Sequence, residues 1–169
     1  MGLDQSLPEI FERAKKIRLL LMDCDGVLTD GRLYFSANGE EMKVFDVRDG
    51  LGLVMWHKAG LQSGIISGRN SPITDLRGRE LGISYILQGV DDKVAAFSEV
   101  IAKAGVSADQ AAFIGDDLPD AELMPHVGFA VAVADAHESA RKASHYITGS
   151  EGGRGAVREV IDILFAARN

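Results

Sequence analysis

Short apolar runs alternate with stretches of helical pattern along most of this chain, and this alternation restricts the fold more than any other feature. Each run has the length of a buried strand. The runs are Ile17–Met22, Gln62–Ile66, Tyr85–Leu87, Ala111–Ile114, Phe129–Val133 and, more weakly, Tyr146–Thr148. Because parallel strands need crossover helices, the order predicts an α/β fold with a doubly wound, mostly parallel, Rossmann-like sheet covered on both faces.

The helical stretches between these runs carry recognisable end signals. Ser6 and Glu9 form a capping-box pattern, Ser71-Pro72 supplies an N-cap and a first-turn proline, and Gly105 is a helix stop. A closing stretch has an apolar stripe at helical spacing. The predicted helices cover about residues 7–16, 73–81, 92–104 and 156–167.

One section departs from the strand-helix alternation. Arg32–Phe35 and Met42–Val47 flank Ser36-Ala37-Asn38-Gly39. The Asn-Gly pair favours a tight turn between two antiparallel strands. The sequence therefore predicts a β-hairpin that projects just after the first strand.

Composition limits both the size and the partners of the chain. Its 169 residues suit a single domain, residues 1–169, around one hydrophobic core. Its net charge of −7 argues against nucleic acid as a partner and favours a small molecule. No apolar run reaches the roughly 20 residues of a membrane span, and Met1–Lys16 lacks the pattern of an export signal. With Cys24 as the single cysteine, we expect a cytoplasmic protein without a membrane partner.

Polar side chains gather where the predicted strands end. In doubly wound sheets, ligands bind at the carboxyl ends of the strands. Carboxylates there suit Mg²⁺, and a serine and a lysine suit phosphate oxygens, so the set points to phosphoryl transfer. Four other aspartates are expected to be mainly structural: Asp30, Asp49, Asp91 and Asp120. The strand-end residues are Asp23, Asp25, Ser67, Lys93, Asp116 and Asp117.

These residues stand in four segments that resemble, in order, the four motifs of the haloacid dehalogenase (HAD) superfamily of phosphatases. Any one segment is weak evidence, whereas four in order at strand ends are a specific signal. The segments are Asp23-Cys24-Asp25-Gly26-Val27-Leu28-Thr29-Asp30, Ile65-Ile66-Ser67-Gly68-Arg69, Lys93 and Gly115-Asp116-Asp117.

The resemblance implies a role for each motif residue. Asp23 would attack phosphorus, and Asp25 would protonate the leaving oxygen and then activate water. Mg²⁺ would be held by Asp23, by the backbone carbonyl of Asp25 and by Asp116. Ser67 and Lys93 would bind the phosphate oxygens.

The spacing of the motifs leaves no room for the cap domain that many HAD phosphatases insert. The 43 residues between Asp23 and Ser67 are filled by the hairpin and a helix, and only 25 residues separate Ser67 from Lys93. The whole chain resembles a capless branch, the 3-deoxy-D-manno-octulosonate 8-phosphate (Kdo-8-phosphate) phosphatases. The matching segments include Asn38-Gly39-Glu40-Glu41, Val47-Arg48-Asp49-Gly50, Val131-Ala132-Val133-Ala134-Asp135-Ala136 and Gly152-Gly153-Arg154-Gly155.

The resemblance to this branch implies the substrate and the assembly. The family hydrolyses a sugar phosphate in cytoplasmic lipopolysaccharide synthesis and forms homotetramers in which a neighbouring subunit helps to close the pocket. Arginine suits the carboxylate and phosphate of a keto sugar acid. The predicted substrate-binding residues are Arg48, Asp49, Gly50, Arg69 and Arg77, with Arg154 reaching across an interface.

Three alternatives remain open from the sequence. A phosphatase for a nine-carbon sialic-type sugar 9-phosphate would have the same catalytic residues. A regulatory paralogue would bind sugar phosphate without turnover. A signalling receiver domain also combines acidic residues, Ser or Thr and Lys, but it carries its phospho-acceptor aspartate after a middle strand, whereas the middle runs here end in Ser67 and Gln88.

Overall fold

A six-stranded parallel sheet forms the centre of the protein. The computed structural model describes residues 7–168, apart from the side chain of Glu41. The strand order is β5-β4-β1-β6-β7-β8, and every neighbouring pair is parallel. This confirms the predicted α/β class. The strands are β1 (Leu19–Met22), β4 (Gln62–Ile66), β5 (Tyr85–Leu87), β6 (Ala111–Gly115), β7 (Phe129–Ala132) and β8 (Tyr146–Ile147).

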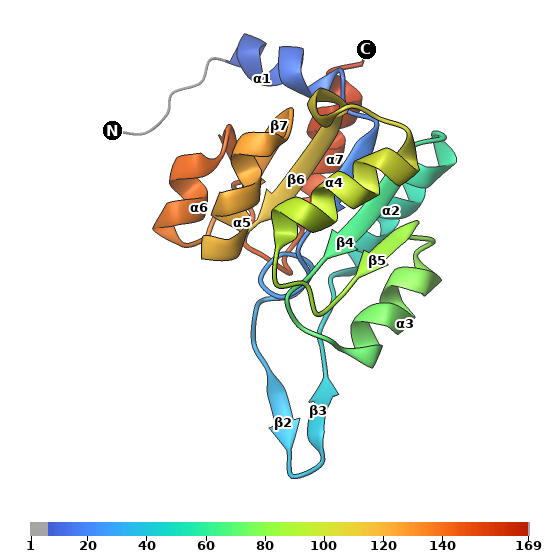
Figure 1. Ribbon diagram of the computed structural model, residues 1–169, viewed down its shortest axis with the longest axis vertical. Helices are drawn as coiled ribbons and strands as arrows, with labels where there is room; N and C mark the ends of the chain where they lie inside the picture. Colours follow the sequence, from blue (N-terminus) through green and yellow to red (C-terminus); the bar gives the residue numbers. More distant parts are fainter. Residues whose placement is uncertain (1–6, 169) are drawn as a thin grey trace.

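Helices cover both faces of this sheet. In Figure 1, α4 and α5 lie in front of it, and α2 and α7 lie behind it. Ser6, the predicted cap of the first helix, lies outside the described residues. No helix among residues 7–168 is long and apolar enough to cross a membrane. The helices are α1 (Leu7–Ala14), α2 (Val47–Lys58), α3 (Pro72–Glu80), α4 (Lys93–Ala104), α5 (Leu118–Leu123), α6 (Glu138–Ala143) and α7 (Ala156–Ala166).

The predicted hairpin is present, but its second strand lies earlier than expected. Strands β2 (Tyr34–Ser36) and β3 (Gly39–Met42) pair antiparallel, with Ser36 opposite Gly39. The prediction of a strand over Met42–Val47 is wrong, because the side chain of Asp46 accepts a hydrogen bond from the amide of Arg48 and so begins α2 at Val47.

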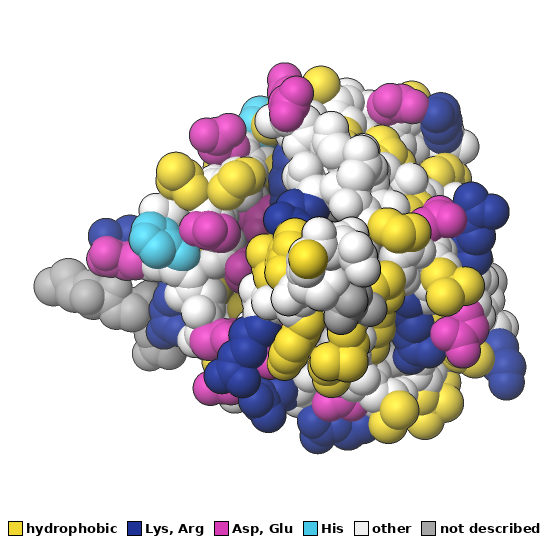
Figure 2. Space-filling model, turned by 90° about the horizontal axis from the view of Figure 1, so that it is seen from below, with side chains coloured by type: hydrophobic (Ala, Val, Ile, Leu, Met, Phe, Trp, Pro, Cys, Tyr) yellow, Lys and Arg dark blue, Asp and Glu magenta, His cyan; other side chains and the backbone are white. Residues whose placement is uncertain are grey.

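The hairpin projects from the sheet and carries apolar side chains on its surface. Figure 2, which views the molecule from the hairpin end, shows hydrophobic side chains gathered there. The exposed apolar residues on and just beside the hairpin are Leu33, Tyr34, Phe35, Met42 and Val44.

The centre of the sheet explains why its carboxyl edge carries polar groups. Strand β1 is fully buried and lies between β4 and β6. Its last residue, Met22, is in register with Ile65 and Ile114. The next amide, that of Asp23, donates to the carbonyl of Ile114. The residues that follow β1, β4 and β6 therefore meet at one edge.

Candidate active site

A pocket of about 320 Å³ opens at this carboxyl edge. It brings together predicted residues from four segments that are far apart in the sequence. Apart from Arg69, the predicted sugar contacts do not line it. The lining residues are Asp23, Asp25, Ser67, Gly68, Arg69, Val90, Asp91, Lys93, Asp116, Asp117 and Pro119.

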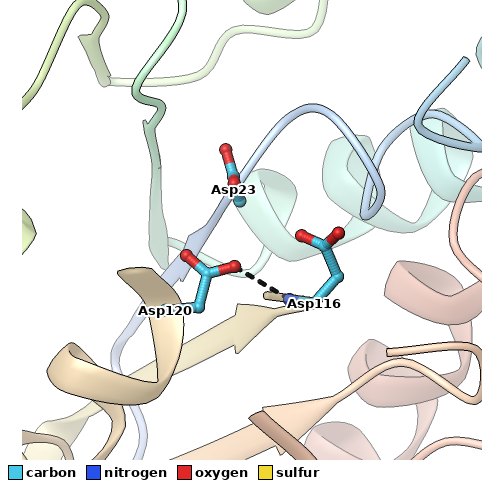
Figure 3. A group of neighbouring side chains, drawn as sticks. All are labelled: Asp23, Asp116 and Asp120. Carbon is cyan, nitrogen blue, oxygen red and sulfur yellow. Dashed lines mark hydrogen bonds between the residues drawn. The ribbon is translucent and has the colours of Figure 1, made fainter. Parts of the chain in front are cut away.

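Three carboxylates meet at the base of this pocket. Asp23, Asp116 and Asp120 each offer an oxygen, and these oxygens lie within 4.8 Å of one another (Figure 3). The loop after β1 also approaches closely, since a Cβ added at Gly26 would lie 2.1 Å from Oδ2 of Asp116. Gly26 has a φ of +90° as well, so both space and backbone conformation require glycine there.

Asp120 is the fully buried member of this group and was expected to be structural. Its Oδ2 accepts from the amides of Asp116 (2.8 Å) and Asp117 (3.2 Å), and its Oδ1 lies 2.6 Å from Nζ of Lys93. Both oxygens are thus already engaged, as are those of Asp23, which contact the amide of Cys24 and Nζ of Lys93, so Asp116 is the member of the group with an unpartnered oxygen. The sequence offers one signal for this residue, its place three positions after Asp117, which is the spacing of the capping box that the two residues form at the start of α5.

Lys93 links the carboxylates to the start of α4. Its side chain is buried, and Nζ lies 2.9 Å from Oδ2 of Asp23 as well as 2.6 Å from Asp120. The carboxylate of Asp92 caps α4 by accepting a hydrogen bond from the amide of Ala95, and this cap makes Lys93 the first residue of the helix. A buried ammonium between two carboxylates stays charged, because burial lowers the pKa of Lys93 but Asp23 and Asp120 outweigh that effect and raise it above its ordinary value.

The carboxylates themselves are held in an environment that disfavours negative charge. Burial, and then the neighbouring Asp120 and Asp23, raise the pKa of Asp116 to about 8. Burial and Asp120 likewise raise the pKa of Asp23 to about 6, against the opposing effect of Lys93. Oδ1 of Asp116 is buried without a hydrogen-bond partner. A buried, unpartnered oxygen among crowded carboxylates fits a hard divalent cation such as Mg²⁺, which prefers oxygen ligands.

These shifts predict that Mg²⁺ binding releases protons. A metal ligand must be ionised, and a raised pKa means that Asp116 in the metal-free protein still carries a proton at neutral pH. Affinity for Mg²⁺ should therefore rise with pH up to about pH 8, by up to about tenfold per pH unit for one proton. Calorimetric titration in buffers of different ionisation enthalpy counts the protons; an affinity that is flat between pH 6 and 8 would contradict the assignment.

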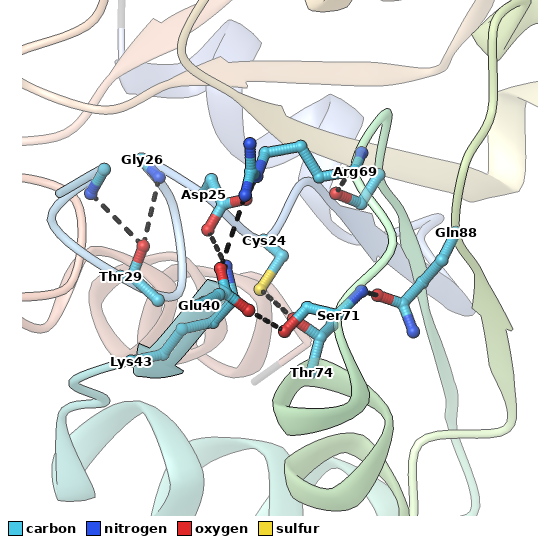
Figure 4. A network of polar contacts seen from close by, with 12 residues as sticks. Cys24, Asp25, Gly26, Thr29, Glu40, Lys43, Arg69, Ser71, Thr74 and Gln88 are labelled. Carbon is cyan, nitrogen blue, oxygen red and sulfur yellow. Dashed lines mark hydrogen bonds and ion pairs between the residues drawn. The ribbon is translucent and has the colours of Figure 1, made fainter. Parts of the chain in front are cut away.

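Asp25 lies at the pocket but faces away from the carboxylate group. Its Oδ1 pairs with Nζ of Lys43, and its Oδ2 lies 3.4 Å from Nε of Arg69 (Figure 4). Ser67, also buried, lines the same pocket, and its Oγ lies 3.4 Å from the amide of Arg69. The Asp25 side chain is thus paired with two cations, and metal binding by its backbone carbonyl stays a prediction.

Two predicted sugar-binding residues have structural contacts instead of pocket positions. The segment from Val47 forms the first turn of α2, so Asp49 points to the start of α7, where its Oδ1 accepts from the amide of Arg158 at 2.8 Å. Burial raises the pKa of Asp49 to about 6. Gly50 makes room for Arg77, because a Cβ there would lie 2.6 Å from that guanidinium. Within one subunit, a sugar-binding role for Asp49 and Gly50 is therefore not supported.

The other arginines also lie outside this pocket. Arg48 pairs with Asp46 and donates to the carbonyl of Arg154 at 2.7 Å. Arg77 lies over the ring of Phe45, 5.8 Å from its centroid. Arg69 is the one predicted sugar contact that the described structure places at the pocket.

The glycine-rich segment, Gly152-Gly153-Arg154-Gly155, packs directly against the loop after β1. The amide of Gly153 donates to the carbonyl of Val27, and the amide of Gly152 donates to the carboxylate of Asp135. A Cβ added at Gly152 would lie 1.8 Å from the carbonyl oxygen of Gly26. The segment thus supports the backbone that carries the pocket aspartates.

We expect Gly152→Ala to lower both stability and activity. The added methyl must displace the backbone of Gly26, and a shift of about 1 Å in a catalytic loop can cost on the order of 10²-fold in rate. Thermal unfolding and kcat report the two effects. Gly60→Ala is the comparison variant. Gly60 has a positive φ and open space around it and lies away from the pocket, so its substitution strains the backbone without displacing the catalytic loop. An unchanged kcat in Gly152→Ala would show that the contact is not required.

Comparison with known proteins agrees with this geometry. The family of haloacid dehalogenase-like hydrolases matches residues 75–161. The 3-deoxy-D-manno-octulosonate 8-phosphate phosphatases KdsC of Yersinia pestis and Escherichia coli K12 are 44% and 43% identical over 95% of this chain, and the match covers 86% and 85% of those proteins.

Solved structures give the same relationship. The crystal structure of the Moraxella catarrhalis phosphatase of this name, in complex with magnesium, phosphate and KDO, has a TM-score of 0.94 and 44% identity, covering 97% of this chain and 94% of that one. The Yersinia pestis phosphatase has a TM-score of 0.92 over 95% of this chain and 86% of its own. This chain therefore belongs to the haloacid dehalogenase-like hydrolases, in the family of the 3-deoxy-D-manno-octulosonate 8-phosphate phosphatases.

Proposed function

We propose that this chain is a Mg²⁺-dependent phosphatase that hydrolyses 3-deoxy-D-manno-octulosonate 8-phosphate to Kdo and phosphate, a step in making lipopolysaccharide precursors. The observation that carries the proposal is the position of Asp23, whose carboxylate lies at the pocket beside Lys93, Asp116 and Asp120. A carboxylate there can attack a phosphorus atom that the pocket holds. The crystal structure of the Moraxella catarrhalis relative is a complex with magnesium, phosphate and KDO.

The metal would be held by Asp23, Asp116 and the backbone carbonyl of Asp25. When bound, Mg²⁺ supplies positive charge that lets an anionic carboxylate approach an anionic ester. Asp120 would not bind the metal itself but would hold the metal-binding segment in place, because it already binds Lys93 and the amides of Asp116 and Asp117. The buried, unpartnered Oδ1 of Asp116 supports this set of metal ligands.

The protein side chains would divide the reaction between them. Asp23 forms a bond to phosphorus as the bond to the sugar oxygen breaks, giving an aspartyl phosphate. Asp25 gives a proton to the leaving sugar oxygen, and its carboxylate then takes one from the water that releases phosphate. Ser67 and Lys93 hold the phosphate oxygens through both steps.

The sugar would be bound partly by residues from a neighbouring subunit. Arg69 is at the pocket and suits a carboxylate or phosphate oxygen. Arg48, Arg77 and Arg154, with Asp49 and Gly50, lie elsewhere in the subunit, so any contact they make with sugar requires another copy of the chain. The exposed apolar side chains of the hairpin support such assembly, and we propose a homotetramer of single-domain subunits in the cytoplasm.

A comparison of two esters tests the substrate. We expect kcat/KM for Kdo-8-phosphate to exceed that for a nine-carbon sialic-type sugar 9-phosphate, with Mg²⁺ required for both. A preference for the nine-carbon ester would overturn the substrate assignment. Binding without turnover across a panel of sugar phosphates would favour a regulatory protein, and light scattering on the same sample reports the assembly.

A further inference from the structure

Lys43, just after the hairpin, contacts the pocket residue Asp25 and is almost completely enclosed. Its side chain is 1% exposed. Nζ pairs with Oδ1 of Asp25 and lies 3.3 Å from Oε1 of Glu40, which stands in β3 (Figure 4). None of the strand-end motifs includes Lys43, because the residue lies beyond the hairpin and its contact with Asp25 forms only in the folded chain.

Lys43 belongs to a group of four charges that are balanced in sign. Asp25 and Glu40 contribute two carboxylates, and Lys43 and Arg69 contribute two cations, with Nη2 of Arg69 3.5 Å from Oε1 of Glu40. Arg69 is the more exposed cation, with 42% of its side chain accessible, so solvent weakens its hold on Asp25. Lys43 is the buried cation, and removing one partner of a buried pair leaves the other charge uncompensated.

The group is anchored at its far side. The hydroxyl of Ser71 donates to Oε2 of Glu40, and the amide of Ser71 donates to Oε1 of Gln88 at 2.9 Å. Ser71 itself is buried at the start of α3. Glu40 is therefore fixed against the body of the protein, and Lys43 is held between a fixed carboxylate and Asp25.

We propose that Lys43 is a positioning residue that directs the carboxyl group of Asp25, which must be protonated to act as the acid, toward the leaving oxygen of the ester and away from Asp23 and Asp116. The inference rests on the proposed function, since it assigns proton transfer to Asp25. Without Lys43, Asp25 and Glu40 face each other with only the exposed Arg69 between them, and Asp25 turns from its present direction. The hairpin thus contributes a side chain to catalysis in its own subunit.

Leaving-group dependence tests this role. An alkyl sugar oxygen needs a proton as it leaves, whereas p-nitrophenolate leaves without one. With enzyme in excess over substrate, we expect Lys43→Met to lower single-turnover release of Kdo from Kdo-8-phosphate by about 10²-fold, the cost of a catalytic group displaced by about 1 Å. Release of p-nitrophenol from p-nitrophenyl phosphate should change by less than about threefold. Lys103→Met, which removes an exposed lysine paired with Glu99, is the matched control.

The outcomes separate the two proposals. If Lys43→Met lowers the rates with both esters equally, including through poor folding, the positioning role is overturned. Wild-type rates with both esters would also overturn it. Failure of the wild-type protein to release Kdo would instead count against the proposed function. Glu40→Gln should show the same selective loss in smaller degree, because Lys43 then keeps Asp25 as its partner.

Discussion

Asp23→Asn is expected to lower the rate of ester hydrolysis by about 10⁴- to 10⁶-fold, the range seen when enzymes lose a member of their nucleophilic machinery. Asparagine keeps the shape of the side chain but cannot form the aspartyl phosphate. The fold should persist, because Lys93 retains Asp120 as a partner at 2.6 Å and is not left as an isolated buried charge.

The measurement is kcat with Kdo-8-phosphate, alongside thermal unfolding of the same variant. Asp75→Asn is a suitable control, since Asp75 pairs with Arg79 on the exposed side of α3 and lies outside the pocket. Rates close to those of the wild type in Asp23→Asn would remove the covalent mechanism. A large loss of stability in that variant would show that Asp23 has a structural role that its contacts do not explain.

Asp25→Asn is expected to be the second most severe substitution, with a loss of about 10²- to 10⁴-fold, the usual contribution of a positioned acid or base. An amide neither gives a proton to the leaving sugar oxygen nor takes one from water. Since Lys43 and Arg69 both lie against this side chain, the neutral amide also leaves two cations with one fewer carboxylate.

The amount of phosphoenzyme distinguishes the two half-reactions in Asp25→Asn. With p-nitrophenyl phosphate the first step needs little acid, so the aspartyl phosphate should accumulate as its hydrolysis becomes limiting. Acid-quenched protein reports the bound phosphate at successive times. Steady turnover with no accumulation and a wild-type rate would show that Asp25 does not activate water.

Much of the fold could be predicted because strand identity is local. The central strand β1 is apolar at every position, as a strand buried on both faces must be, and the fully buried strands β6 and β7 likewise hold only apolar residues and one glycine. The hairpin boundary was missed for a local reason too. Residues 42–47 have strand-like composition, but Asp46 satisfies the first amides of α2, and this cap ends the extended segment.

The residues of the active site likewise include some that the local sequence pattern predicts and some that it does not. Asp23, Asp25 and Asp116 follow strands, so topology alone brings them to one edge. Asp120 was expected to be structural, and it does form a capping box on α5, but its contact with Lys93, 27 positions away, could not be read from the local pattern.

Residues whose roles depend on distant contacts left no readable signal. Lys43 meets Asp25 only because the projecting hairpin returns the chain to the end of β1. The positions of Arg48 and Arg154 relative to a sugar depend on how subunits pack, which a single sequence does not specify. The order of the motifs therefore predicts the catalytic residues, whereas the residues that position them are found only from the structure.

Locating the phosphoryl group on the protein tests the central claim most directly. Wild-type protein turning over Kdo-8-phosphate with Mg²⁺ is quenched in acid, and borohydride converts an aspartyl phosphate into homoserine that peptide sequencing can place. The account predicts homoserine at position 23. Homoserine at another aspartate, or continued turnover with residue 23 unmodified at every time of quenching and in Asp25→Asn as well, would contradict it.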